Sequence, residues 1–487
     1  MSSVHRSRRT ALIVLGFFAL VFGLVSFPNH ELFRTYALDL GLYTHALWHY
    51  AHGGAHDSSL FLDHAQPILS DHFDLYLPVL SPLIYVLGSW TLLIVQWVAV
   101  LAGAWGVRRV LIELGSSSLD ALLGMAVFLL NFGLFAAMAF DYHSNVVAAM
   151  ILPWFILMLL RGRMLGSCVL FFAMLLAKEN MGFWLGPLAM VLFTMDVIPS
   201  RMRRACLVLG PLGMLWSVCV IGWIMPLLSS AGAYAHFDYG ILGKDLAHVP
   251  SAFIERPIEI LRALFMDHRG VSNGTEIKLE FWWMMLASGG WALLVKPKWG
   301  LMALPLIAQK MWHDDPGKWS VVAHYGVEFA PLIGIAVPLA LARSRSSMVR
   351  RTLAGITVML ALGTTVRFMD HTVAYQDRSR IRIYKHEHYS KPYSIEHVRH
   401  ALDLIPDDAP VSAQSPAVPH LALRDRLYQY PLINDAEYIL LLPLESPYPL
   451  DVVTYSTRME LLLEDPEWVV LEKSDAVVLF RKSSLRD

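Results

Sequence analysis

Acidic and histidine side chains interrupt an otherwise apolar sequence at a few places, and these residues are the ones able to do chemistry. Asp39 stands in the sequence LDLG, with no basic residue nearer than Arg34. A carboxylate without a cationic partner can act as a general base. The alternatives are a solvated loop acid and a helix N-cap.

A second ionisable group lies on a very short turn between two apolar runs. Lys178 and Glu179 end one run, and the next begins at residue 181. An ionisable group at the edge of the hydrocarbon costs on the order of a few kcal/mol and persists where it has a partner or faces a cavity. Either the two residues pair with each other, or Lys178 binds an anionic phosphate while Glu179 holds it in place.

Asp141 and His143 directly follow another apolar run. Asp141 would either cap the next helix, because acids stabilise helix N-termini, or contact a substrate. His143 beside a phosphate or carboxylate would be a hydrogen-bond donor or an acid–base group.

Histidines at helical spacing raise the question of a metal site. His45, His49, His52 and His56 are three or four residues apart and can share one helix face. Their aromatic neighbours suit an interfacial belt instead, and the sequence has no HExxH motif. No metal ligands are predicted, and a requirement for a divalent metal cofactor is left open.

The elements that must position these residues are apolar. Of 487 residues, 56% are hydrophobic and 16% charged, and the mean hydropathy is +0.48. A soluble domain carries about a quarter charged residues, so this composition indicates a membrane protein. The net charge of -1 argues against nucleic-acid binding, and the three cysteines lie in apolar runs, where buried thiols are expected.

Two rules predict the topology: a spanning helix needs about 20 apolar residues, and Lys and Arg gather on the cytoplasmic side. They predict about 11 transmembrane helices in residues 1–366, with a cytoplasmic N-terminus. Residues 75–88 are interpreted as interfacial or re-entrant, because a full span there would put every later Arg pair outside. The helices are expected at about 10–28, 90–107, 119–140, 145–160, 164–177, 181–197, 205–228, 281–295, 299–312, 322–342 and 352–366.

This topology puts the unusual polar residues on the external side, in long loops at 29–89 and 229–280 and at outer helix ends. The cytoplasmic ends carry almost only Arg and Lys. The external set is Asp39, His45, His49, His52, His56, Asp63, His64, Asp71, His72, Asp141, His143, Lys178, Glu179, Asn180, His313, Asp314, Asp315, His324 and Tyr325. Such one-sidedness indicates an external face where a substrate is bound.

Residues 367–487 carry more charge and are expected to form a small external α/β domain. Short runs typical of strands lie at 411–413, 468–471 and 476–480. The stretch 419–431 either docks this domain on the membrane portion or binds a partner protein, and docking is the preferred interpretation.

Taken together, these motifs resemble a bacterial family of predicted membrane proteins, domain of unknown function 2079, over nearly the whole chain. The sequence departs from the family pattern at Leu38, where Phe is typical, and at Ser144–Asn145, where Pro-Glu is usual. The second departure leaves no acid directly after His143. The motifs are Asp39–Gly41, Asp71–Phe73, Phe140–His143, Lys178–Glu179, His324–Tyr325 and Pro419–His420, with Tyr428 and Pro431.

That family is similar in layout to the GT-C glycosyltransferases, which use polyprenyl-phosphate sugars. The resemblance implies a protein of the bacterial inner membrane in which Asp39 or Asp71 deprotonates an acceptor hydroxyl, with inverting displacement at the anomeric carbon. The acceptor would be a glycan, a lipid or a protein. Lys178, His143 and Arg34 would bind the lipid phosphate. The remaining substrate-binding residues expected are His72, Asp141, Glu179, His324 and Tyr325.

Two other function classes fit a polytopic membrane protein. A transporter or flippase would place binding residues near the middle of the bilayer, where the predicted helices contain little beyond Gln96, Asn131 and glycines. A non-catalytic assembly protein would bind its partner through the C-terminal tail.

Overall fold

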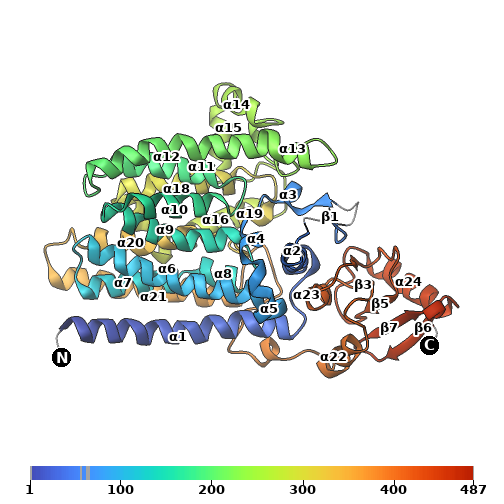
Figure 1. Ribbon diagram of the computed structural model, residues 1–487. Helices are drawn as coiled ribbons and strands as arrows, with labels where there is room; N and C mark the ends of the chain where they lie inside the picture. The colour runs from blue at the N-terminus through green and yellow to red at the C-terminus, as the bar shows by residue number, and fades with distance from the viewer. Residues whose placement is uncertain (1–2, 55–56, 62–65, 486–487) are drawn as a thin grey trace.

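The computed structural model describes residues 3–54, 57–61 and 66–485, and it is a helical bundle with a small sheet at one end (Figure 1). Each apolar run expected to be a helix contains one, but the helix expected at 322–342 begins only at Phe329, because residues 322–328 form turns. The main helices of the bundle are α1 (Ser3–Glu31), α6 (Thr91–Glu113), α7 (Ser118–Leu129), α8 (Phe132–Ala139), α9 (Ser144–Leu160), α10 (Met164–Leu175), α11 (Met181–Phe193), α12 (Ser200–Cys219), α16 (Gly274–Met285), α17 (Trp291–Val295), α18 (Pro297–Met311), α20 (Phe329–Leu341) and α21 (Ser347–Asp370).

Fewer helices than predicted are long enough to cross a membrane. Within the described residues, four stretches qualify by length and composition, and a bent pair of helices makes a fifth. An α-helix rises 1.5 Å per residue, so α10 and α11 cover only about 20 Å of a hydrocarbon layer roughly 30 Å thick. Eleven complete spans are therefore not confirmed. The four stretches are Arg6–Glu31, Tyr76–Glu113, Ser200–Leu228 and Ser347–Asp370.

The prediction of one continuous helix at 119–140 is wrong. The helix breaks between α7 and α8, whose axes differ by 44°. The side chain of Asn131 accepts a hydrogen bond from the backbone N–H of Gly133 at 2.9 Å and so caps α8. A single polar residue in an apolar run thus starts a second helix, and α8 ends just before Asp141.

The segment expected to be interfacial or re-entrant is a series of short helical turns that leads directly into α6. It comprises α4 (Tyr76–Leu80) and α5 (Ile84–Leu87), separated by a 3-10 turn that contains Pro82. Gly88, with φ of 55°, bends the chain before α6. Proline and glycine therefore divide a stretch that is longer than a bilayer is thick.

Close helix contacts depend on small residues. A Cβ atom on Gly182 of α11 would lie 1.8 Å from the carbonyl oxygen of Gly213 on α12, so no larger residue fits there. Small residues at contacts and large apolar residues on outer surfaces are typical of membrane bundles. Ile13 on α1 and Val208 on α12 are 64% and 66% exposed, as lipid-facing side chains are.

The C-terminal region contains a five-stranded sheet with the order β4-β3-β5-β7-β6. β3 runs parallel to β4 and β5, and β7 is antiparallel to β5 and β6. The strands confirm the three short runs predicted for this region. Their bounds are β3 (Val411–Ala413), β4 (Leu427–Gln429), β5 (Tyr438–Leu441), β6 (Trp468–Lys473) and β7 (Val478–Lys482), with helices α22 (Ile395–Asp403) and α24 (Val452–Glu464).

The sheet region is docked on the turn that carries Asp39. This turn is η1 (Ala37–Gly41), one turn of π-helix. The Ser415 hydroxyl accepts a hydrogen bond from the N–H of Ala37 at 3.1 Å, and the ring of His420 stacks on that of His30 at 4.2 Å. Of these two contacts, that of His420 comes from the stretch 419–431, for which docking was the preferred interpretation, and Ser415 lies just before that stretch.

Arg34 fastens the chain that connects α21 to the sheet region. Its guanidinium donates to four backbone carbonyls, at 2.8 Å for His388, Glu387 and Ser390 and 3.3 Å for Ser379. With its donors used in this way, Arg34 is a structural anchor.

We predict that Gly41→Ala loosens the packing of the sheet region on the turn η1. A Cβ atom there would lie 2.8 Å from Cγ1 of Val418, and overpacking of this kind costs about 1–3 kcal/mol. Thermal unfolding in detergent should show a lower midpoint for Gly41→Ala, partly restored by Val418→Ala in the same chain. Gly363→Ala, where a Cβ meets nothing within 4 Å, is the control. Equal midpoints for Gly41→Ala and the control would contradict the prediction.

Candidate functional site

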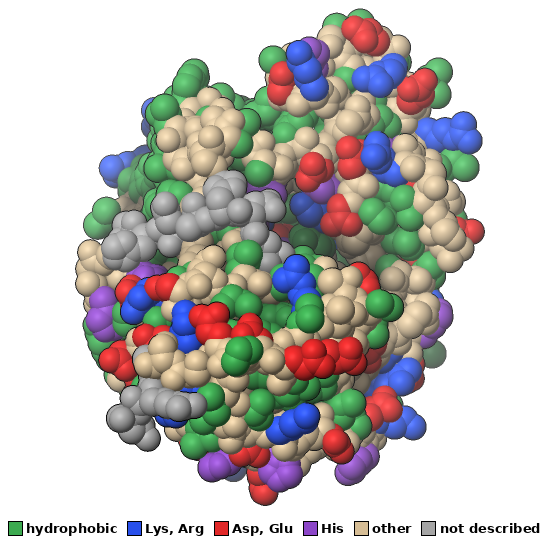
Figure 2. Space-filling view, turned by 90° about the vertical axis from the view of Figure 1, so that its right-hand side faces the viewer, with side chains coloured by type: hydrophobic (Ala, Val, Ile, Leu, Met, Phe, Trp, Pro, Cys, Tyr) green, Lys and Arg blue, Asp and Glu red, His purple; other side chains and the backbone are tan. Residues whose placement is uncertain are grey.

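The candidate site lies at the end of the bundle to which the sheet region is docked. Figure 2 looks onto this end and shows a recess where histidine, acidic and basic side chains gather. The residues come from turns at which helices end and from three connecting segments, 72–74, 229–240 and 312–328. Because helix ends meet here, side chains that are far apart in the sequence become neighbours.

Asp39, the predicted base, lies against two stacked histidines. Its carboxylate is 3.3 Å from Nε2 of His143, and the Asp39 side chain is 33% exposed. The ring of His143 stacks on that of His324 at 3.6 Å. Burial alone would raise the pKa of Asp39, but the hydrogen bond and charge of His143 outweigh it, so the pKa lies below its usual value. Asp39 is therefore ionised at neutral pH.

Asp141 fixes the turn that carries Asp39 through hydrogen bonds and an ion pair. It is 1% exposed, and its carboxylate accepts hydrogen bonds from the backbone N–H groups of Tyr36 at 2.9 Å and Leu40 at 3.4 Å. The other oxygen pairs with Arg380 at 2.8 Å. Burial would lower the pKa of Arg380, but Asp141 outweighs this and raises it. The acid therefore orients η1, and with it Asp39; it does not cap the following helix.

Lys178 and Lys318 form a pair of cations, here called the lysine pair. Lys318 donates to Nε2 of His313 at 2.8 Å. Burial, with the charge of Lys178 next, lowers the pKa of Lys318 to about 8. Among the described residues, no hydrogen bond or ion pair engages the ammonium group of Lys178. Both lysines line the same cavity, and two neighbouring cations are suited to bind an anion.

Glu179 is held by groups other than Lys178. Its carboxylate accepts from the backbone N–H of Phe73 at 3.2 Å and the hydroxyl of Tyr234 at 3.1 Å, and it lies 3.5 Å from Nδ1 of His72. The alternative in which Lys178 and Glu179 simply pair with each other is therefore not what the structure has.

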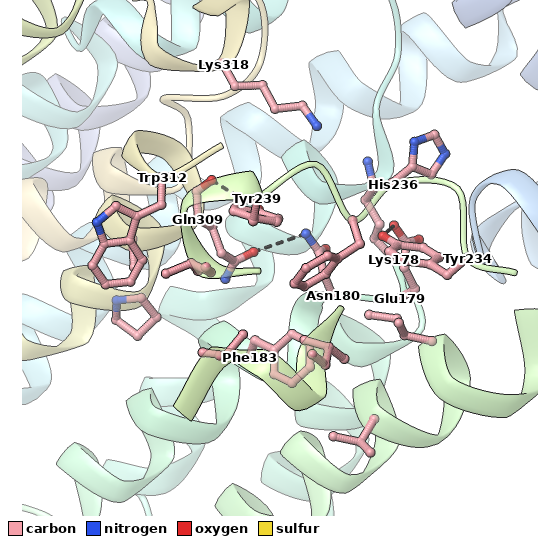
Figure 3. A pocket seen from close by; sticks show the side chains of 18 of the residues that line it. Lys178, Glu179, Asn180, Phe183, Tyr234, His236, Tyr239, Gln309, Trp312 and Lys318 are labelled. Atoms are coloured by element: carbon pink, nitrogen blue, oxygen red, sulfur yellow. Dashed lines mark hydrogen bonds between the residues drawn. The ribbon is translucent and has the colours of Figure 1, made fainter. Parts of the chain in front are cut away.

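A cavity of about 450 Å³ opens beside the lysine pair. Figure 3 shows Lys318, which lies in the short helix α19 (Pro316–Trp319), reaching toward the side where Lys178, Glu179 and His236 lie. Asn180, which donates to the side chain of Gln309 at 3.1 Å, forms part of the wall. His72, Tyr234, Tyr239 and Gln309 add further polar groups to the wall. The apolar part of the wall consists of Phe183, Val218, Ile221, Phe237, Leu242, Leu246, Val249, Pro250, Pro305, Ala308 and Trp312. One end thus suits a charged group and the other a hydrocarbon chain.

Asp71, the second acid predicted as a base, belongs to a cluster with His72 and His236, here called the Asp71 cluster. Asp71 accepts from Nε2 of His236 at 2.8 Å, and the rings of His72 and His236 lie 4.5 Å apart. Burial would raise the pKa of Asp71, but the hydrogen bond from His236 outweighs it and lowers the pKa. One ligand atom from each residue lies within 4.8 Å of the other two, so these three groups are able to hold a metal ion.

The other predicted residues lie around this centre. Tyr325 and His324 line a smaller space of about 100 Å³ that also contains the lysine pair. Asn145, at the departure from the family pattern, donates to the carboxylate of Glu328, which comes from another segment, at 2.6 Å.

The histidine series of the first loop does not gather into one group. His45 and His49 lie with their Nε2 atoms 3.2 Å apart, whereas the ring of His52 stacks on Trp48. The remaining members, His56 and the nearby Asp63 and His64, are outside the described residues.

Four residues of the site were not predicted: Tyr234, His236, Lys318 and Arg380. Tyr234 and His236 lie in the long external segment predicted at 229–280, and Lys318 lies in the short external connection between the helices predicted at 299–312 and 322–342. For these three residues, their place among other polar residues on the predicted external side is the available signal. Arg380 has no such signal, because its partner Asp141 is 239 residues away.

A family model described as "Predicted membrane protein (DUF2079)" matches residues 29–484. The crystal structure of ArnT from Cupriavidus metallidurans, bound to undecaprenyl phosphate, is similar with a TM-score of 0.54 and 12% identity, covering 98% of this chain and 97% of that chain. The similarity extends over both the bundle and the sheet region, so it is a likeness of the whole fold. No curated protein matches the sequence.

We predict that Asp141→Asn destabilises the protein, because it leaves Arg380 as a buried and unpaired charge. Loss of one partner of a buried ion pair costs about 3–5 kcal/mol. Arg399→Ala, which breaks a pair with Glu31 between half-exposed side chains, should change stability by about 0.5 kcal/mol or less. Unfolding in detergent measures both. Similar losses for the two variants would show that the Asp141–Arg380 pair is not essential.

Proposed function

The chain belongs to the predicted membrane protein family DUF2079, and we propose that it is a GT-C-like membrane glycosyltransferase that uses a polyprenyl-phosphate-linked sugar. The observation that carries the proposal is the cavity with the lysine pair at one end and an apolar wall at the other. A polyprenyl phosphate has the same division into an anionic group and a long hydrocarbon chain. The bound lipid of the similar ArnT structure, undecaprenyl phosphate, supports this choice of ligand.

The proposed reaction uses Asp39 as the base and the lysine pair as the group that stabilises the leaving phosphate. An acceptor hydroxyl attacks the anomeric carbon, its proton passes to Asp39, and the bond from that carbon to the phosphate oxygen breaks. The leaving polyprenyl phosphate gains the negative charge, which Lys178 and Lys318 stabilise. Electrostatic stabilisation of a leaving phosphate needs cations already in place, and the lysine pair meets that condition.

Asp39 is the better base of the two candidate acids. Its side chain is 33% exposed and 3.3 Å from its histidine, whereas Asp71 is 20% exposed and bonded at 2.8 Å. A base must reach the proton of an incoming acceptor, so the more accessible and less tightly bonded carboxylate is favoured. His143, between Asp39 and His324, orients the carboxylate.

The proposed location is the bacterial inner membrane, with the site on the external side. It is supported by the Arg and Lys residues at the opposite ends of the helices, according to the rule that positive residues stay inside. The acceptor, a glycan, lipid or protein, would approach from the side of the C-terminal domain.

A transporter or flippase is the main alternative, and one buried polar residue bears on it. Gln96 lies within α6, but its side chain bonds to the backbone of the Ala137–His143 segment, accepting from the His143 N–H at 2.9 Å. It supports the turn that carries His143 and lines no path through the bundle. This observation favours the enzyme.

We predict that Asp39→Asn abolishes transfer without abolishing lipid binding, since the amide keeps the shape of the side chain but cannot take the proton. In the source bacterium, deletion of the gene should remove at least one glycosylated lipid or protein detected by mass spectrometry. Wild type and the control Asp475→Asn, an exposed acid of the C-terminal domain, should restore it. Restoration by Asp39→Asn at equal protein levels would contradict the role of Asp39.

Binding of undecaprenyl phosphate should weaken at alkaline pH because of Lys318. A lysine with its pKa lowered to about 8 loses its charge above that pH, and the bound phosphate restores the pKa toward its usual value. Affinity should therefore fall by roughly tenfold per pH unit above 8, or about 20-fold between pH 7.5 and 9.5. Tryptophan quenching on titration of the purified chain measures this, since Trp312 lines the cavity.

The matched variant is Lys318→Arg, whose guanidinium stays charged throughout this range. It should bind at pH 7.5 and lose little affinity at pH 9.5. An equally steep fall in the variant would show that another group controls the pH dependence.

A further inference from the structure

The Asp71 cluster has no role in the proposed transfer, yet it brings together three groups that ligate metals. Asp71 ends α3 (Ile68–Asp71) and His72 follows it, whereas His236 comes from the segment 229–240, more than 160 residues later. One oxygen and two ring nitrogens lie within 4.8 Å of one another, and the Asp71 and His236 atoms are 2.8 Å apart. No other group of this kind occurs among the residues that the structure describes.

We propose that Asp71, His72 and His236 bind a zinc ion. Zinc takes histidine nitrogens at about 2.0–2.1 Å and carboxylate oxygens at about 2.0–2.2 Å, so ligand atoms around it stand roughly 3.4 Å apart. The three atoms here need to move by an ångström or less to reach that geometry. Two imidazoles with one carboxylate favour zinc over magnesium or calcium, which prefer oxygen ligands.

A carboxylate behind the ligands supports the assignment. A histidine that binds a metal through one ring nitrogen commonly directs the other toward a carboxylate, which fixes the ring. Glu179 lies 3.5 Å from Nδ1 of His72, and Tyr234 and the Phe73 N–H hold Glu179 in turn. His72 Nδ1 has no hydrogen bond to any group that the structure describes, so the ring needs only a small rotation to complete this relation.

The ion would join two external segments at the wall of the cavity. His72 and His236 both line the cavity, so the fourth position of a tetrahedral zinc faces it. A zinc ion with three protein ligands keeps one position for water or an anion. The site therefore fixes the 229–240 segment over the cavity and adds positive charge near the lysine pair. The zinc site does not depend on the chain being a glycosyltransferase.

The test uses the full-length chain, purified in detergent, stripped with chelator and dialysed against Zn²⁺ or Co²⁺. Elemental analysis should give about one zinc per chain for wild type. His236→Ala and Asp71→Asn should lose most of it, with affinity lowered at least tenfold. His248→Ala is the matched control, because His248 and Asp245 form an exposed pair at 2.7 Å without a third ligand. The control should bind zinc as wild type does.

A second variant keeps the test decisive if His236→Ala fails to fold. His236→Cys retains a ligand, and with Co²⁺ it should show a thiolate-to-cobalt charge-transfer band that wild type lacks. That band, with lost binding in Asp71→Asn, supports the site. Wild type without stoichiometric zinc, zinc retained by Asp71→Asn, or cobalt bound by His236→Cys without the band would overturn it.

Discussion

The carboxylate of Asp141 joins three chain segments, and the position of the turn that carries Asp39 depends on it. It bonds to backbone N–H groups at the start of the turn that carries Asp39 and pairs with Arg380 in the segment leading to the C-terminal domain. A buried charge is stable only where partners replace the water it has lost. Asp141 has such partners only when both segments are in place, so folding of the bundle end and docking of the tail are linked.

The sheet region takes part in this linkage through its contacts with the turn η1. Its Ser415 and Val418 lie against η1 from one side, while Asp141 holds the same turn from the other. Asp39 is thus fixed by contacts on both sides of a single helical turn. Next to it, the lysine pair lies where water and the apolar wall of the cavity meet. The cost of keeping two cations there is offset when an anion binds between them.

Much of this fold follows from local sequence pattern, because apolar runs, Arg-rich ends and alternating strand residues are short-range signals. The helices and the strands β3, β6 and β7 were predicted on that basis, and so were the segments that carry the site. The breaks within helices were harder to predict from the sequence. Hydropathy alone predicts one continuous helix at 119–140, but the side chain of Asn131 caps a second helix, α8. A cap depends on a single side chain, so an average over an apolar run does not show it. Whether a helix as short as α10 is part of a membrane crossing depends on the helices packed beside it, and its own composition does not decide it.

The site was predicted in part. Asp39, Asp71, His143 and Lys178 lie where the polar residues converge, but their partners come from distant segments. Arg380 and His236 contact Asp141 and Asp71 across 239 and 165 residues, and no local pattern marks such pairs. For Arg34, the sequence pattern indicated a contact that the structure does not have. An arginine beside the first helix has the chemistry of a phosphate ligand, yet in three dimensions it binds four backbone carbonyls.

The central claim is that a lipid phosphate binds between Lys178 and Lys318 with its chain along the apolar wall. A cryo-electron microscopy structure of the full chain in a nanodisc with undecaprenyl phosphate tests it most directly. The account predicts phosphate density in contact with both ammonium groups and hydrocarbon density along Phe183, Ile221 and Val249. A lipid phosphate elsewhere, for example in the groove of α1 lined by Leu20, Leu24 and Trp97, with the cavity empty, would contradict it.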